Sequence, residues 1–325
     1  KTLRCFMCAH QCRIPPDKTG FCNVRFNRDG DLFTVTYQRI AAQNTDPVEK
    51  KPLYHFLPGS RTYSIGTSGC NFRCSFCQNW GIARIRPEDT DIDEAVQSLS
   101  PRQVVEEAFK NDCKSIAYTY TEPTMFLEYV IDTAVEAHRN GLKNIFITNG
   151  YLTEPALRKL IPVLDACNVD LKSFSNDFYR KRCSATLAPV LKTLEILKEH
   201  RVWTEVTTLI IPEENDTVEE FTNIAGFIVS LGRETPWHIS RFYPQFHMND
   251  RPPTPVESLK VAEETGRSLG LSYIYKGNIP EKKQRHTRCP GCGTMVVQRD
   301  TLARKIKINM AENRCPSRSA VIPGV

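Results

Sequence analysis

The sequence predicts an α/β fold built as a barrel of parallel strands, with a small cysteine-rich module before it and a cysteine-containing tail after it. From about residue 61 to residue 276, short β-rich runs alternate with amphipathic helical segments. This alternation requires parallel strands joined by right-handed crossovers, as in a barrel or an open doubly wound sheet. Polar residues follow several of the strands in turn, which favours the barrel because its ligands bind at the carboxyl ends of many strands.

Three units follow from the pattern: an N-terminal module at 1–58, the barrel at 59–280 and the C-terminal tail at 281–325. A chain of 325 residues is long enough for two or three such units. In the first unit, the stretch NVRFNRDGDLFTVTY at 23–37 predicts a hairpin, because Asp29-Gly30 supplies the positive φ values that a two-residue turn requires.

The barrel unit contains seven candidate strands separated by helices whose ends can be recognised. The strands are expected at 62–66, 115–120, 144–148, 168–172, 202–210, 238–242 and 271–275. Helix starts are predicted at Ser100-Pro101, at Thr217 with Glu220 and at Thr254-Pro255 with Glu257, and helix ends at Gly141, Gly232 and Gly270.

The composition is that of an ordinary globular chain with an unusual number of thiols. Hydrophobic residues make up 40% and charged residues 25%, and no apolar run approaches the roughly 18 residues that a membrane span needs. We therefore expect a cytoplasmic protein without a membrane partner. In a reducing compartment, 13 cysteines at short spacings indicate metals rather than disulfides. The net charge of +6 includes a basic run at 281–288, which we expect to be a solvated loop rather than a nucleic-acid patch.

The stretch GCNFRCSFCQNW at 69–80 places three thiols, Cys70, Cys74 and Cys77, directly after the first barrel strand. Four thiolates would complete the coordination of a cubane iron–sulfur cluster, whereas three leave one iron open. An open position is the mark of a catalytic metal centre. Phe76 can place an aromatic face beside the ligand of that iron. A zinc knuckle is the alternative, but a fourth ligand is absent nearby in the sequence.

This motif resembles the CxxxCxΦC signature of the radical S-adenosylmethionine (SAM) enzymes, in which Φ is aromatic. The resemblance implies a radical SAM barrel, which is a partial (β/α)6 barrel of the TIM type. In this barrel SAM binds the open iron of a 4Fe-4S cluster through its amino and carboxylate groups. One electron, from a donor such as ferredoxin or flavodoxin, then cleaves the sulfonium to give methionine and a 5'-deoxyadenosyl radical.

A narrower resemblance covers nearly the full chain. The order CxxCxxxC, KKPLYHFLPG, GCNFRCSFCQNW, AYTYTEPTMF, ITNGY, VDLKSF, WHISRFYP and CPGCG is similar to the radical SAM member of the AmmeMemoRadiSam system. That family is grouped with activating enzymes of pyruvate formate-lyase type. The resemblance supplies no agreed substrate.

Several strand-end residues gain roles from the resemblance. Glu122, in AYTYTEPT, matches the acidic residue that holds the SAM amino group, and a helix-start carboxylate is the alternative. Asn149 at 148–150, and Asp170 with Lys172 at 170–172, match strand ends that line the SAM site in the activating enzymes. For Asn149 the alternative is a turn residue, and for Asp170 and Lys172 an ion pair at the barrel rim.

Other candidates carry less specific signals. His238 is a candidate contact of SAM or substrate, as is His55, although packed histidines explain both patterns as well. Cys183, in the loop after the fourth strand, is either an inert packed thiol or a hydrogen donor. Cys113 and Cys167 are expected in the core, and Trp80 either shields the cluster or packs in the core.

The four N-terminal cysteines, Cys5, Cys8, Cys12 and Cys22, suit either tetrahedral zinc or a second iron–sulfur cluster. We expect zinc, because a small hairpin module with little core needs a structural metal. A second cluster would relay electrons and would have to lie close to the first.

The C-terminal CPGCG at 289–293 is half of a zinc ribbon. The second half departs from the pattern, because Arg318 stands where the last cysteine of CxxC belongs. The candidate zinc ligands are therefore Cys289, Cys292 and Cys315, with His286 or another thiol as the fourth, unless the metal has been lost.

The leading functional hypothesis is a radical SAM enzyme that abstracts hydrogen from a partner protein or a small molecule. One alternative is a radical SAM enzyme that modifies RNA through the basic run, which salt-dependent binding would reveal. Another is a non-catalytic iron–sulfur or zinc scaffold protein. Release of 5'-deoxyadenosine from SAM distinguishes the enzyme from the scaffold.

Overall fold

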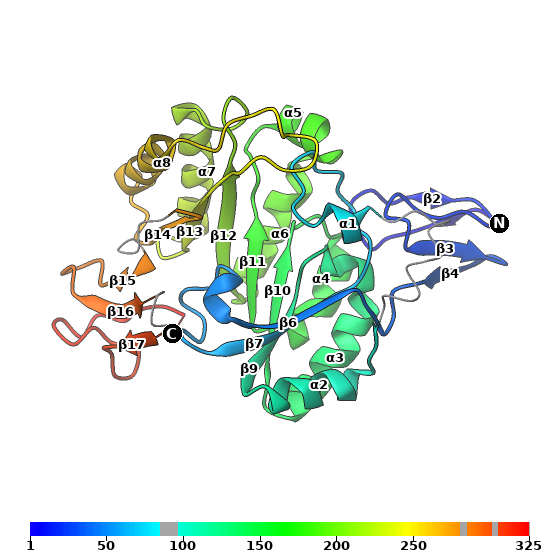
Figure 1. Ribbon diagram of the computed structural model, residues 1–325, viewed down its shortest axis with the longest axis horizontal. Helices are drawn as coiled ribbons and strands as arrows, with labels where there is room; N and C mark the ends of the chain where they lie inside the picture. The colour runs from blue at the N-terminus through cyan, green and yellow to red at the C-terminus, as the bar shows by residue number, and fades with distance from the viewer. Residues whose placement is uncertain (85–96, 280–284, 301–304, 325) are drawn as a thin grey trace.

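The computed structural model describes residues 1–84, 97–279, 285–300 and 305–324. Its centre is one eight-stranded sheet in the order β14-β13-β12-β11-β10-β9-β7-β6 (Figure 1). The strands are β6 (Ala42–Pro47), β7 (Arg61–Gly66), β9 (Cys113–Tyr118), β10 (Lys143–Thr148), β11 (Ala166–Asp170), β12 (Trp203–Ile210), β13 (Trp237–Arg241) and β14 (Ile274–Gly277).

All seven predicted barrel strands are present, and they run parallel from β7 to β14. The edge strand β6 pairs antiparallel with β7. Among the described residues no ladder joins β6 to β14, so the sheet curves into a partial barrel that stays open. The α/β barrel class predicted from the sequence is therefore confirmed.

Six helices connect the parallel strands and pack along the outside of the sheet (Figure 1). They are α2 (Pro101–Lys110), α3 (Leu127–Arg139), α4 (Glu154–Leu160), α6 (Ala188–Glu199), α7 (Val218–Leu231) and α8 (Val256–Ser268). The short elements are α1 (Trp80–Ala83), α5 (Asn176–Phe178), the 3₁₀ turns η1 (Val48–Lys50), η3 (Pro123–Phe126) and η4 (Ile161–Val163), and the π-type turn η5 (Tyr179–Cys183).

A helix follows each of the three predicted helix starts, and two of the three have the predicted side-chain cap. Ser100 forms a full capping box on α2, and Thr217 accepts a hydrogen bond from the backbone of Glu220 at the start of α7. The Glu220 carboxylate does not complete the box and instead accepts from the backbone N of Phe174, at 2.5 Å. At α8, which begins at Val256, only the predicted cap is wrong. Thr254 accepts from Phe242 N and donates to Ile210 O, so it joins β12 to β13 instead of capping the helix.

The N-terminal region packs onto the barrel instead of forming a core of its own. It holds β1 (Leu3–Arg4), β2 (Arg13–Ile14), β3 (Arg25–Arg28), β4 (Asp31–Thr34) and β5 (Arg39–Ile40), and β5 pairs with β8 (Gln97–Ser98). The predicted hairpin is β3-β4, with φ of 54° at Asp29 and 87° at Gly30. Cys8, Cys22 and Val24 belong to the same hydrophobic cluster as the barrel core. Because β6 lies in the barrel sheet, the division at residue 58 stays a prediction.

The C-terminal tail is a small antiparallel sheet at the opposite end of the long axis from the N-terminus (Figure 1). It consists of β15 (Thr287–Arg288), β16 (Met295–Asp300) and β17 (Lys305–Ile308). Its own small hydrophobic cluster contains Cys289, Val296, Cys315 and Ile322. The predicted boundary at 280/281 and the first part of the basic run, 281–284, lie outside the described residues.

Within the part of the chain that the structure describes, no helix is both long and apolar enough to cross a membrane.

Candidate functional site

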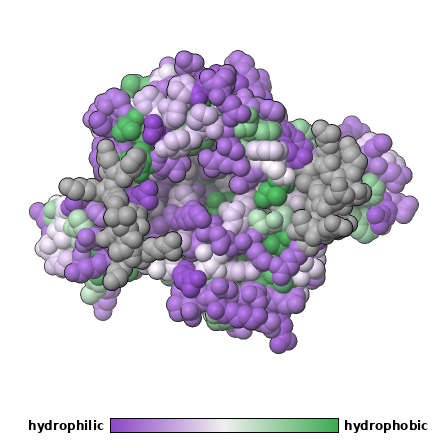
Figure 2. Space-filling view, in the orientation of Figure 1, coloured by the Kyte–Doolittle hydropathy of each residue, from purple (hydrophilic) through white to green (hydrophobic). Residues whose placement is uncertain are grey.

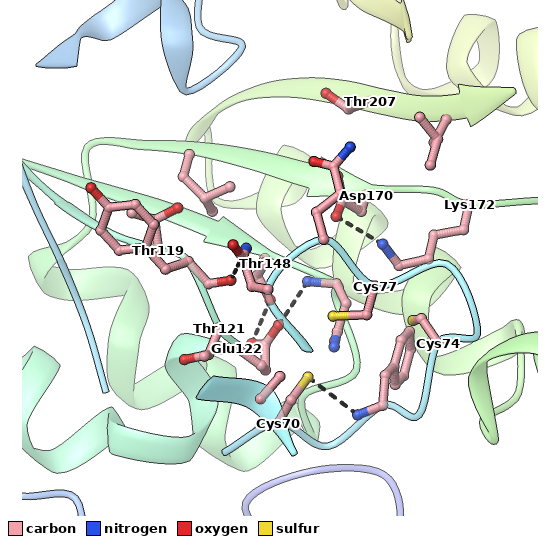
Figure 3. Close-up of a pocket in the computed structure, with 18 of the residues that line it drawn as sticks. Cys70, Cys74, Cys77, Thr119, Thr121, Glu122, Thr148, Asp170, Lys172 and Thr207 are labelled. Atoms are coloured by element: carbon pink, nitrogen blue, oxygen red, sulfur yellow. Dashed lines mark hydrogen bonds and ion pairs between the residues drawn. The ribbon is translucent and has the colours of Figure 1, made fainter. Parts of the chain in front are cut away.

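A cavity of about 400 Å³ opens at the carboxyl ends of the parallel strands. Figure 2 shows the hollow in the middle of the face viewed, and Figure 3 shows the side chains that line it. Its lining combines the three-cysteine loop with polar residues that follow successive strands. These lining residues include Cys70, Cys74, Phe76, Cys77, Thr119, Glu122, Thr148, Asn149, Asp170, Lys172, Thr207 and Ser240.

The loop that carries Cys70, Cys74 and Cys77 is held from two sides by distant segments. Arg73 N donates to Cys183 O at 2.8 Å, and Ser75 N donates to Arg182 O at 2.9 Å. On the other side, His247 N donates to Ser75 O at 3.0 Å. These backbone bonds tie the loop to the turn after β11 and to the segment after β13, so its shape depends on the tertiary fold of the barrel.

The three thiols are half-buried at the wall of the cavity (Figure 3). Burial raises the pKa of Cys70 and of Cys77 above the usual thiol value. A hydrogen bond with the neighbouring Cys183, together with burial, raises the pKa of Cys74. Thiols in such surroundings become thiolates only when a cation compensates the charge, and metal binding releases the proton. A cluster of iron ions therefore suits this donor set.

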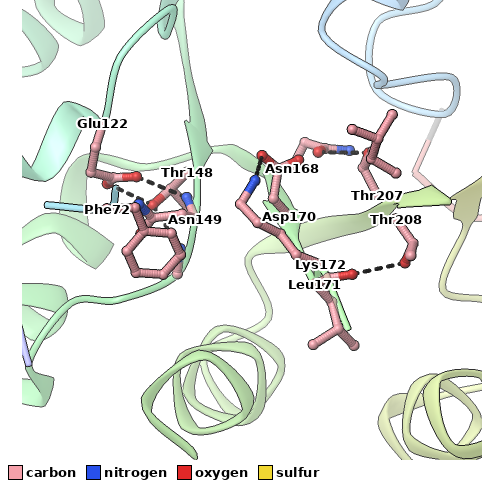
Figure 4. Close-up of polar contacts among 12 residues, drawn as sticks. Phe72, Glu122, Thr148, Asn149, Asn168, Asp170, Leu171, Lys172, Thr207 and Thr208 are labelled. Atoms are coloured by element: carbon pink, nitrogen blue, oxygen red, sulfur yellow. Dashed lines mark hydrogen bonds and ion pairs between the residues drawn. The ribbon is translucent and has the colours of Figure 1, made fainter. Parts of the chain in front are cut away.

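Glu122 lies at the base of the cavity and is 2% exposed. Its Oε1 accepts hydrogen bonds from Thr124 N, Thr124 Oγ1 and Thr148 Oγ1 at 3.1, 2.5 and 2.7 Å, and its Oε2 accepts from Asn149 N at 2.8 Å (Figure 4). Burial raises the pKa of this carboxyl, and the hydrogen bonds oppose that effect. The carboxylate therefore joins the ends of β9 and β10 and has one oxygen with a single protein donor, which can accept another.

Asn149 continues this network toward the cysteine loop. Its Nδ2 donates to Asn71 Oδ1 at 2.7 Å, and its own Oδ1 accepts from Tyr151 N at 3.0 Å. Asn149 thus makes the local turn that the sequence left open as an alternative, and it also binds the residue next to Cys70.

Asp170 and Lys172 form an ion pair of 2.9 Å at the end of β11 (Figures 3 and 4). Lys172 Nζ also lies 5.8 Å from the centre of the Phe76 ring, within cation–π range. Burial alone would lower the pKa of Lys172, but Asp170 and the sulfur of Cys74 raise it overall. A fixed positive charge therefore stands beside the three-cysteine loop.

The cavity also contains polar residues that the sequence did not single out. Thr207 and Ser240 face it from β12 and β13, and Thr207 Oγ1 donates to Asn168 Oδ1 at 2.9 Å. Lys51 lines its other side and forms a 2.8 Å ion pair with Asp46. Both residues stand within predicted strands, at 202–210 and 238–242, but threonine and serine are too common in strands to indicate a site.

The structure does not bring His238 to the cavity. His238 lies near the start of β13, and its Nε2 is 2.6 Å from Glu205 Oε2, in a buried network whose residues do not line the cavity. His55 belongs to the same network through Tyr275, at 2.7 Å from its hydroxyl. Both are packed histidines, the second interpretation that the sequence allowed, because both rings are buried and hydrogen-bonded to other buried groups.

The lone cysteines and Trp80 have distinct surroundings. Cys113 and Cys167 are buried as predicted, and Cys183 is completely buried against Cys74. Trp80 is 46% exposed and stacks on Phe246 at a ring distance of 5.3 Å, so it is not a core residue.

The two flanking cysteine groups differ in geometry. All four N-terminal residues, Cys5, Cys8, Cys12 and Cys22, line one small cavity. In the tail, the sulfurs of Cys289, Cys292 and Cys315 lie within 4.8 Å of one another, which suits a single metal ion. His286 is not part of this group, and its Nδ1 accepts a hydrogen bond from Arg299 N.

These features define a parallel α/β barrel protein with a thiol-lined cavity at the carboxyl ends of its strands. Residues 64–228, just over half of the chain, match the model of the radical SAM superfamily. The chain belongs to this superfamily, which confirms the resemblance seen in the sequence. Membership implies an enzyme with a 4Fe-4S cluster and SAM.

Two relatives show how far the similarity extends. An uncharacterised protein of Methanocaldococcus jannaschii is 42% identical over 315 residues, covering 96% of this chain and 92% of the relative. The pyruvate formate-lyase-activating enzyme of Listeria monocytogenes is 24% identical over 225 residues, covering 64% of this chain and 86% of that enzyme.

Solved structures share the fold at low sequence identity. Streptococcus suis SuiB bound to S-adenosylmethionine superposes with a TM-score of 0.51 at 10% identity, over 65% of this chain and 48% of SuiB. A radical SAM methyltransferase from Sphaerobacter thermophilus gives a TM-score of 0.50 at 16% identity, over 68% of this chain and 67% of that enzyme.

Proposed function

We propose that this protein cleaves SAM reductively at a 4Fe-4S cluster on Cys70, Cys74 and Cys77 and abstracts hydrogen from a protein or small-molecule substrate. The observation that carries the proposal is the gathering of these three thiols and Glu122 around one cavity at the carboxyl ends of the barrel strands. The similarity to pyruvate formate-lyase-activating enzymes supports a reaction of the activase type. SuiB has also been solved with a precursor peptide, which supports peptide-like substrates for this fold.

Each polar group at the cavity has a task in this proposal. Glu122 accepts a hydrogen bond from the ammonium of the SAM methionyl group through Oε2, which has one protein donor. Lys172 supplies a positive charge near the thiolates and offsets part of their charge. Asn149 fixes the loop residue next to Cys70. When bound, the cluster and SAM supply a one-electron cleavage that yields methionine and a 5'-deoxyadenosyl radical.

The barrel wall protects the reaction from water. Ile147, Leu209 and Phe72 line the cavity between the polar groups, so part of its surface is apolar. A reactive intermediate survives longer where solvent is excluded. The polar residues Thr207 and Ser240 lie beyond the SAM-facing group, on β12 and β13, and we assign the substrate to their side of the cavity.

The test is anaerobic incubation of reconstituted, reduced protein with SAM, followed by quantification of 5'-deoxyadenosine. Release of 5'-deoxyadenosine that disappears in the variant with Cys70, Cys74 and Cys77 all replaced by alanine supports the proposal. Absence of SAM cleavage from a protein that contains the cluster would refute it. Stimulation by reduced flavodoxin or ferredoxin would identify the class of electron donor.

A further inference from the structure

A second thiol-lined cavity lies beside the three-cysteine loop and has no part in the proposed SAM chemistry. All four N-terminal cysteines line it, and three of them, Cys5, Cys8 and Cys22, are 6 to 7% exposed. Cys12 is half-buried. The sequence left zinc and a second iron–sulfur cluster as alternatives for this group and favoured zinc, on the ground that the module has little core.

The structure does not support this argument for zinc. The interior of the module is continuous with the barrel core, and the buried Arg25 pairs with Glu128 of α3 at 2.5 Å. Arg25 also donates to Met125 O at 3.3 Å. Because the barrel already holds the module in place, no separate structural metal is needed for that purpose.

The spacing of the sulfurs favours a group larger than one ion. Tetrahedral zinc, with Zn–S bonds of about 2.3 Å, brings its four sulfurs to within about 4 Å of one another. Among the described residues, three or more ligand atoms lie within 4.8 Å of one another only in the C-terminal tail. The four N-terminal thiols line a common cavity, but no three of their sulfurs meet that limit, and neither do the sulfurs of Cys70, Cys74 and Cys77. An iron–sulfur cubane needs this wider spacing, since each thiolate binds a different iron.

Two buried hydrogen-bond donors also indicate that an anionic group binds in this cavity. Asn71 is completely buried, and in the described part of the chain its Nδ2 has no hydrogen-bond partner. The same holds for Nε of Arg25, which is 3% exposed. Both residues line the cavity of the four thiols. Because an unsatisfied buried donor costs roughly 1 to 3 kcal/mol, these groups imply a missing acceptor, and the sulfides and thiolates of a cluster are such acceptors.

The cavity touches the catalytic loop directly. Asn71 follows Cys70 in the chain, and its carbonyl lies 2.7 Å from Nε2 of His10 in the module. Gly69 has a φ of +91°, and a side chain there would collide with Val24, so only glycine permits this close approach. Aromatic rings bridge the same interface: His10 is 5.0 Å from Tyr151, which is 5.2 Å from Phe72.

We propose that Cys5, Cys8, Cys12 and Cys22 hold a second iron–sulfur cluster that relays electrons to the catalytic cluster. The relay, though not the metal assignment, rests on the proposed function. One electron from a reduced flavodoxin or ferredoxin reduces the second cluster and then passes to the catalytic one. It is consumed when one carbon–sulfur bond of SAM breaks to methionine and the 5'-deoxyadenosyl radical, and the second cluster returns to its oxidised state.

Metal content tests the assignment without any activity measurement. The full-length protein, purified and reconstituted anaerobically, should contain about eight irons and eight sulfides per chain, in two cubanes. The variant Cys70→Ala, Cys74→Ala, Cys77→Ala should keep about four irons, and the variant Cys8→Ala, Cys22→Ala should lose about four. Cys113→Ala is the matched control, since this buried thiol lines neither cavity, and should keep all the iron.

Paramagnetic resonance of the reduced protein separates the two clusters. We expect two signals, of which SAM changes one, and the other should persist in the triple variant. Broadening of this second signal in wild type relative to the triple variant would show that the clusters are close enough for electron transfer.

A wild-type protein with about four irons, whose zinc is lost in the Cys8→Ala, Cys22→Ala variant, would overturn the assignment. The iron count of the wild-type protein is decisive, so this test holds even if the variant folds poorly. Two clusters of which neither responds to SAM would refute the proposed function and support the second-cluster assignment.

Discussion

Replacing Glu122 with glutamine should weaken SAM binding roughly 10-fold to 150-fold. The carboxylate is surrounded by donors, with Thr124 and Thr148 at Oε1 and the backbone N of Asn149 at Oε2. The ammonium of SAM would lose an ionised acceptor, worth about 1.5 to 3 kcal/mol, and each 1.36 kcal/mol is a factor of ten. In addition, either orientation of the amide turns its NH₂ toward a backbone N–H, which should cost about 1 to 3 kcal/mol of stability.

A second variant separates these two effects. Thr124→Val removes one donor to the same carboxylate but leaves its charge, and Thr124 does not line the cavity. We expect a stability loss of about 1 kcal/mol with less than a threefold change in SAM affinity. Equilibrium binding of SAM to the anaerobically reconstituted proteins gives the affinity, and denaturant unfolding gives the stability. Equal weakening of SAM binding in both variants would refute a direct contact and leave Glu122 a purely structural carboxylate.

Three further changes test other parts of the structure. Cys74→Ala should lose the catalytic iron and SAM cleavage, whereas Cys183→Ala should keep both if Cys183 only packs against Cys74. Iron and sulfide quantification distinguishes the two variants, and iron loss in Cys183→Ala would indicate that Cys183 is a fourth ligand. Burial outweighs the opposing effect of Glu205 and lowers the pKa of His55 to about 4. Because the unfolded pKa is about 6.5, protonation of His55 destabilises the fold, and the free energy of unfolding should fall by on the order of 3 kcal/mol from pH 6.5 to pH 4. The variant His55→Gln should show a smaller dependence of stability on pH. Cys315→Ala should lose about one zinc per chain at unchanged iron, and equal zinc content in variant and wild type would contradict a metal in the tail.

The barrel could be predicted from the sequence because its signals are local and repeated. All seven strands show β-rich runs, and glycines such as Gly141 end helices where the sequence placed them. The failure at Thr254 has a physical cause: a capping signature contains a polar side chain, and that side chain can bond to another strand instead. Strand β6 was missed because AQNTDP has polar and proline residues and pairs only on one side, at the sheet edge.

Some residues of the candidate site could likewise be predicted from the sequence, and others could not. The three cysteines stand within eight positions of one another, so the sequence could predict a common loop before any fold was known. His238 is a candidate contact of SAM or substrate because it stands on a predicted strand, 238–242, and the packed alternative is the one that the structure shows. Its position near the start of β13 places it beside Glu205 and outside the lining of the cavity. Which end of a strand a residue occupies depends on strand boundaries, and these are the least certain part of a sequence prediction.

The same difference between local motifs and scattered residues explains why the cofactor can be inferred and the substrate cannot. In the proposed function, SAM is held by a contiguous motif and by the acidic Glu122, whereas the rest of the lining, which includes Lys51, Thr207 and Ser240, comes from separate segments of the chain. A cavity of about 400 Å³ is near the lower end of the 300 to 1,000 Å³ typical of ligand pockets, so SAM would fill much of it. A protein substrate would then have to present a single residue to the radical, at the side of Thr207 and Ser240. Substitutions there should therefore change which substrate reacts while leaving SAM affinity intact, which is the opposite of the result expected at Glu122.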